Sequence, residues 1–193
     1  MTRSKPVRKL ADLRGMRIRA PTELLAVLSG LGADPVNMPM GEVYSALAKG
    51  VIDGVVAPPD TLRALHLVEV ANYFYELRVP RGAYPARAMS AKRWRSLEEW
   101  QQALLQRSKP VWEAALADEI RRSEAVGREA GKGKITFSLP DPVEQQRFDE
   151  VYLKDAAVNA RRLQRFGIDG PAAFRLARNS VVGRDSIKCG GVS

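Results

Sequence analysis

The stretch "DLRGMRIRAPTELLAVLSGLGADPV", residues 12–36, contains the pattern that decides the fold. Residues 16–20 alternate apolar and basic side chains and predict a short strand. Pro21 is well suited to begin a helix, and leucines follow it at helical spacing until Gly32, which ends the helix. Residues 34–39 predict a second extended segment, so the order is that of a βα unit followed by the next strand.

The same alternation continues towards the middle of the chain. Residues 40–50 predict a helix, residues 51–58 an apolar strand, and residues 59–71 a third helix. Short strands that alternate with helices over such short distances are typical of βαβ units and a parallel sheet. The sequence therefore predicts the α/β fold class for this part of the protein.

The predicted sheet brings one arginine to a position where ligands commonly bind. Ligands of parallel sheets lie beyond the carboxyl ends of the strands. Arg19 is near that end of the first strand, and Ala57 and Pro58 are near that end of the third, so we expect them to face one crevice. A guanidinium matches a carboxylate with two parallel hydrogen bonds. From the residues alone, Arg19 is either an anion-binding residue or half of an internal salt bridge to Asp53 or Glu42.

The second half of the chain has a different pattern. We expect a break at Ser108 and Pro110, and loose order in the Gly- and Arg-rich tail. The other predicted elements are extended segments over 72–90 with a bend at 80–82, a helix over 91–106, a helix over 111–131, a strand within 132–140, and a helix over 141–167.

The charge of the chain raises a second possibility for its function. The net charge is +9, and residues 1–19 are strongly basic, which is typical either of an arm that binds nucleic acid or of a solvated segment. No nucleic-acid-binding motif accompanies the charge, so we do not favour nucleic acid as a partner. No apolar run is long enough to cross a bilayer, and the first residues do not form a signal peptide.

Several chemistries are absent from the sequence. The one cysteine, Cys189, allows no internal disulfide, and the one histidine, His66, is expected at the surface of a helix. We find no nucleophile motif, phosphate-binding loop or metal-ligand spacing. We therefore expect no catalytic residues, no metal and no cofactor, and a binding protein in place of an enzyme.

Three segments of the sequence resemble those of a known family. They are "DLRGMRIRAP" (residues 12–21), "LGADPVNMPMGEVYSALAKGVIDGV" (residues 31–55) and "MSAKRWRSL" (residues 89–97). In this order, they resemble the DctP-type solute-binding proteins of TRAP (tripartite ATP-independent periplasmic) transporters, and the resemblance extends from about residue 5 to about residue 150.

The resemblance implies a two-lobed, type II periplasmic-binding-protein-like receptor. Such a receptor binds a small organic acid in the periplasm and delivers it to membrane permease subunits. It implies that Arg19 binds the ligand carboxylate and that Met40 lines the site, with core packing as the alternative for Met40. Ala57 replaces a usual asparagine and Pro58 follows it, which suggests a more apolar wall. Arg81 is either a second cationic contact or an exposed loop residue.

The resemblance also suggests a domain organisation. Residues 12–78 would form the ligand-binding α/β lobe, residues 79–168 a crossover and the long helices of an incomplete second lobe, and residues 169–193 a loosely ordered tail. Hinges are expected near residues 12–15 and 78–82. The chain resembles only the C-terminal portion of the family, so two other interpretations stay open: a basic nucleic-acid-associated protein, and a truncated receptor fragment without function.

Overall fold

Three short parallel strands form the centre of the fold. β1 (Arg17–Arg19) lies between β2 (Asp34–Val36) and β3 (Gly54–Val55), and Ile18 is paired with both neighbours. Ile18 is buried whereas Arg17 is exposed, as the alternation in the sequence predicts. The computed structural model describes residues 1–79 and 87–180 of the protein.

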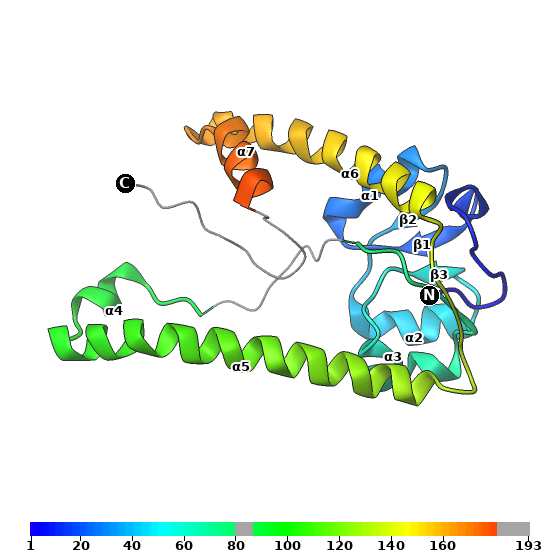
Figure 1. Ribbon diagram of the computed structural model, residues 1–193, viewed down its shortest axis with the longest axis horizontal. Helices are drawn as coiled ribbons and strands as arrows, with labels where there is room; N and C mark the ends of the chain where they lie inside the picture. Colours follow the sequence, from blue (N-terminus) through cyan, green and yellow to red (C-terminus); the bar gives the residue numbers. More distant parts are fainter. Residues whose placement is uncertain (80–86, 181–193) are drawn as a thin grey trace.

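Short helices connect these strands and cover the sheet. Figure 1 shows α1 on one side of the strands and α2 and α3 on the other. The predicted α/β class with short parallel strands is therefore confirmed. The helical elements of this region are η1 (Leu10–Leu13), η2 (Thr22–Leu24), α1 (Leu25–Gly30), α2 (Met40–Ala48), α3 (Thr61–Ala64) and η3 (Leu67–Glu69).

A second, two-stranded sheet is joined to the first through the N-terminal residues. β4 (Tyr73–Tyr75) is parallel to β5 (Thr136–Ser138). Thr2 forms antiparallel bridges to both Gly54 and Tyr73, and its N–H donates to the Tyr73 carbonyl oxygen at 2.9 Å. The first residues of the chain therefore connect the two sheets.

Two buried clusters form the hydrophobic core. One cluster includes side chains of α2 and α3, and the other includes side chains of η1, α1 and α6 (Pro142–Arg162). Their buried members are Met1, Val43, Leu47, Ile52, Val55, Leu62, Leu67, Ala71, Phe74 and Ile135 in the first, and Val7, Leu10, Leu13, Met16, Ile18, Ala20, Leu24, Val27, Leu28 and Phe148 in the second.

The basic N-terminal segment is part of this core. Val7, Leu10 and Leu13 are buried in the second cluster, and Met1 is buried in the first. Residues 1–19 are therefore packed into the body of the protein and do not extend from it as an arm.

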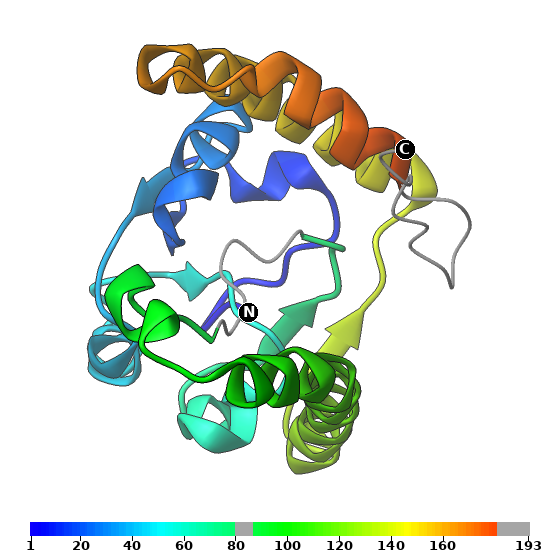
Figure 2. The ribbon, with the colours of Figure 1, turned by 90° about the vertical axis from the view of Figure 1, so that its left-hand side faces the viewer.

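Long helices make up most of the remaining chain. They are α4 (Ala91–Arg95), α5 (Glu99–Gly131), α6, the 3-10 helix η4 (Leu163–Phe166) and α7 (Gly170–Ser180). Asp141 caps α6 by accepting the Val143 N–H at 2.8 Å, as the sequence predicts. In Figure 2, α6 and α7 lie along one side of the molecule and α5 is seen nearly end-on at the other.

Four helix predictions are wrong. The helix expected over 91–106 is interrupted, because α4 ends at Arg95 and α5 begins at Glu99. α5 continues through Ser108 and Pro110, because a proline inside a helix removes one N–H without necessarily ending it. Residues 170–180 of the expected loose tail form α7, while residues after 180 lie outside the described part. The helix predicted over 59–71 is divided into α3 and η3 by His66, whose φ of 55° is left-handed.

Candidate functional site

A cavity of about 720 Å³ lies where the ends of several strands meet. Its wall includes Arg19 at the end of β1, residues 55–59 at the end of β3, and residues 74–79 at the end of β4. Residues of α5 and α6 also contribute to the wall. This volume is in the usual range for small-molecule sites, roughly 300–1,000 Å³.

Arg19 is half-buried in this wall, and its side chain forms a single hydrogen bond to the described part of the protein. Its Nε donates to the Met38 carbonyl oxygen at 3.0 Å, which leaves both Nη groups without a partner among the described residues. Burial lowers the pKa of the Arg19 guanidinium, and the carboxylate of Glu23 acts in the opposite direction. No ion pair of Arg19 is found among the described residues. Because a half-buried cation has lost part of its hydration, an anion that enters the cavity would replace that lost interaction.

The salt bridge that the sequence left open for Arg19 is not formed. Among the described residues, neither Asp53 nor Glu42 pairs with Arg19, and Asp53 instead accepts the backbone N–H of Arg17 at 2.8 Å. The side chain of Arg17 is exposed and its Nε lies 3.8 Å from Asp34. The two arginines of β1 therefore have different environments, and only Arg19 lines the cavity.

The structure brings four of the five residues predicted to bind ligand to this cavity. Met40 at the start of α2 lines the cavity together with Arg19, Ala57 and Pro58. Whether they contact a ligand stays a prediction. Arg81, the fifth residue, lies outside the described part of the chain.

The wall of the cavity is mainly apolar. Aliphatic and aromatic side chains contribute from both core clusters, and they include Val7, Leu13, Ile18, Leu24, Leu28, Val55, Val56, Leu65, Phe74, Leu77, Val79 and Phe148. The Tyr75 hydroxyl is also buried here and has no hydrogen-bond partner among the described residues, and its burial raises the pKa of the phenol. A ligand with a substantial apolar surface would fit such a wall.

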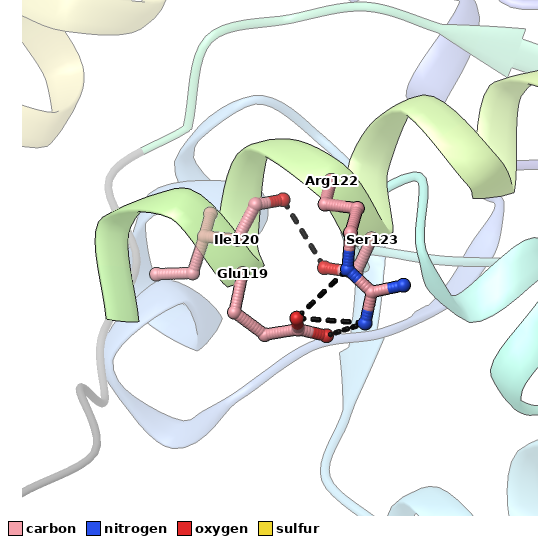
Figure 3. A network of polar contacts seen from close by, with 4 residues as sticks. All are labelled: Glu119, Ile120, Arg122 and Ser123. Atoms are coloured by element: carbon pink, nitrogen blue, oxygen red, sulfur yellow. Dashed lines mark hydrogen bonds and ion pairs between the residues drawn. The ribbon is translucent and has the colours of Figure 1, made fainter. Parts of the chain in front are cut away.

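An ion pair in the wall was missed by the sequence analysis. Glu76, just after β4, pairs with Arg128 near the end of α5, with 2.7 Å between Oε2 and Nη1. No local signal marks either residue, because α5 carries many charges. Figure 3 shows another glutamate–arginine pair about two turns earlier in α5, in which Arg122 and Glu119 form hydrogen bonds within the helix. That pair is exposed and does not line the cavity with Arg19.

Several other charged residues line a separate pocket of about 450 Å³, namely Asp60, Arg63, His66, Glu119 and Arg122. His66 is exposed, with its Nδ1 3.2 Å from Glu69, away from the cavity. Within residues 1–79 and 87–180, no cluster of three potential metal-ligating side chains is found. No helix of the described residues has the length and apolar character needed to span a membrane.

Solved structures of TRAP solute-binding proteins are similar to this protein. One from Rhodoferax ferrireducens, in complex with copurified benzoate, is 25% identical with a TM-score of 0.75, over 92% of this chain and 57% of that chain. One from Bordetella bronchiseptica, with bound (R)- and (S)-mandelate, is 25% identical with a TM-score of 0.69, over 90% of this chain and 56% of that one.

Sequence comparison leads to the same class of protein. A solute-binding protein of Roseobacter denitrificans is 40% identical over 75 residues, which are 38% of this chain and 23% of that protein. The chain thus spans a little more than half of the solved structures, and its match covers about a quarter of this relative. The family model for the bacterial extracellular solute-binding proteins, family 7, matches residues 1–155. The protein therefore belongs to this family, the DctP family of solute receptors.

Proposed function

We propose that the protein is the solute-binding component of a TRAP transporter and that it binds a small organic acid through Arg19. The observation that supports this most is the position of Arg19 in an otherwise apolar cavity, with two Nη groups that no described residue occupies. A carboxylate can accept two parallel hydrogen bonds from such a group.

The comparisons support the same class of ligand. Two similar solved structures hold benzoate and mandelate, which are carboxylates with an aromatic body. The apolar wall around Ala57 and Pro58 suits a body of this kind. The proposal includes a periplasmic location, TRAP permease subunits as partners and no enzymatic activity, since the family consists of solute receptors.

The N-terminal residues give little support to nucleic acid as the partner. Their apolar side chains are buried in the two core clusters, and Thr2 joins the two sheets. A segment packed in this way is not available to wrap around a nucleic acid.

Two arginines of β1 provide a matched test of this function. Isothermal titration calorimetry of the 193-residue chain with benzoate and mandelate should give a lower affinity for Arg19→Gln, by about 100-fold, because two charge-assisted hydrogen bonds are lost. Arg17→Gln removes the same charge from the same strand but outside the cavity, and its affinity should stay within about twofold. Equal losses in both variants, or no loss in Arg19→Gln, would contradict the role of Arg19.

A further inference from the structure

In the wall of the cavity, Arg128 forms an ion pair with Glu76, whereas Arg19 forms no ion pair among the described residues. Glu76 and Arg128 both line the cavity that contains Arg19; the Glu76 side chain is 19% exposed, whereas that of Arg128 is exposed, at 44%. The Arg128 guanidinium also lies over the ring of Phe137, 6.0 Å from its centre. Arg128 is therefore held in place by two contacts, and one of them is already a carboxylate.

The whole described wall of the cavity is balanced in charge. It contains three arginines and three glutamates, although the chain as a whole carries a net charge of +9. Glu124 lies one helical turn before Arg128 and adds a second carboxylate to that side of the wall. The amine of Met1 also lines the cavity, but its burial lowers its pKa to about 5, so it carries no charge at neutral pH.

This distribution of charges should favour the binding of a ligand with one carboxylate over a ligand with two. A first carboxylate can bind Arg19 without breaking an ion pair, although the charge of Glu23 also acts on this arginine. A second carboxylate on the same ligand would have to compete with Glu76 for Arg128 and would be repelled by the glutamates. Arg78 lines the cavity too. It is exposed, as Arg128 is, so that water weakens the charge of both side chains, but only Arg128 is paired with a carboxylate among the described residues.

We infer that Glu76 is a specificity-determining residue, which occupies Arg128 and so restricts the site to monocarboxylates with an apolar body. This inference rests on the proposed function of Arg19 and adds the substrate class of the same cavity. It predicts that removal of the Glu76 charge makes Arg128 available to a second carboxylate.

The substitution Glu76→Gln tests this with little risk to the fold. Gln has nearly the shape of Glu, and the backbone N–H of residue 76 keeps its hydrogen bond to the Ser138 carbonyl oxygen, at 2.8 Å. The matched control is Glu129→Gln, which breaks an exposed ion pair with Lys132 at the end of α5, outside the cavity.

Benzoate and terephthalate are suitable probes, because they share one ring and differ by one carboxylate. In calorimetric titrations, the wild-type chain should bind benzoate more tightly than terephthalate by at least about tenfold. Glu76→Gln should raise the affinity for terephthalate by about tenfold and change that for benzoate little, whereas Glu129→Gln should change neither. The added substitution Arg128→Gln in the Glu76→Gln variant should remove the gain.

The outcomes separate this inference from the function on which it rests. Wild-type protein that binds both acids equally, or a Glu76→Gln variant that binds benzoate and gains nothing for terephthalate, would overturn the inference and leave the proposed function intact. If the wild-type chain bound neither these two acids nor mandelate, the proposed function itself would be overturned, and this inference with it.

Discussion

The two arginines of β1 show how the environment of a residue decides its role. They are separated by one residue and have the same side chain, yet Arg17 is exposed beside Asp34 whereas Arg19 is half-buried beside a backbone carbonyl. Because Asp34 already faces Arg17, that arginine gains little from another anion. Arg19 has no such partner among the described residues and is the better anion receptor.

The amine of Met1 leads to a prediction about pH. It is fully buried, donates to the Val55 carbonyl oxygen at 2.9 Å, and has its pKa lowered by burial to about 5. Between pH 8 and pH 5 the unfolded chain binds a proton at this amine that the folded chain does not. The stability should therefore be highest above pH 8 and should fall as the pH decreases towards 5, by up to about 4 kcal/mol.

Urea unfolding of the 193-residue chain at several pH values between 5 and 8.5 measures this effect. His66→Gln removes the one histidine, which is exposed, and this variant should show the same loss of stability. An unfolding free energy that stays constant or increases as the pH falls through this range would contradict the buried amine.

At the scale of the elements, the packing of α5 positions one side of the cavity. Gly127 lies against the backbone between Pro59 and Asp60, where a Cβ atom would be 2.1 Å from the Pro59 carbonyl oxygen. This close approach holds the end of α5 against α3 and places the neighbouring Arg128 in the wall of the cavity.

Gly127→Ala should therefore affect both stability and binding. We expect it to lower the free energy of unfolding by about 1–3 kcal/mol, because backbone atoms must move to accept the methyl group. Gly41→Ala in α2 is the control, since no atom lies within 4 Å of the added methyl group, and it should be neutral or stabilising. Denaturant unfolding of both variants measures the difference, and an equal effect of the two would contradict the close packing of α5.

Elements with a strong local pattern were the ones that the sequence predicted well. The β1 strand and the capped start of α6 are found where the alternation and Asp141 predict them. The break that Pro110 predicted in α5 is not found, because a helix of 33 residues keeps most of its hydrogen bonds when one N–H is missing. The amphipathic pattern of residues 170–180 was not recognised in the sequence, although α7 packs against α6.

At the scale of the whole molecule, the site is assembled from segments that are distant in the sequence. Arg19, Ala57 and Pro58 could be predicted to share a crevice, because the ends of parallel strands meet at one edge of a sheet. The pair of Glu76 and Arg128 could not, since it depends on how α5 packs beside β4. The bridge of Thr2 between the two sheets likewise has no local signal.

The central claim is that Arg19 receives the carboxylate of an organic acid inside this cavity. A crystal structure of the chain with benzoate tests it most directly. We expect the benzoate carboxylate at about 2.7–2.9 Å from the Nη atoms of Arg19, with its ring against the apolar wall that includes Ala57 and Pro58. Benzoate bound elsewhere, with the Arg19 guanidinium paired to an acidic side chain of the protein, would contradict it.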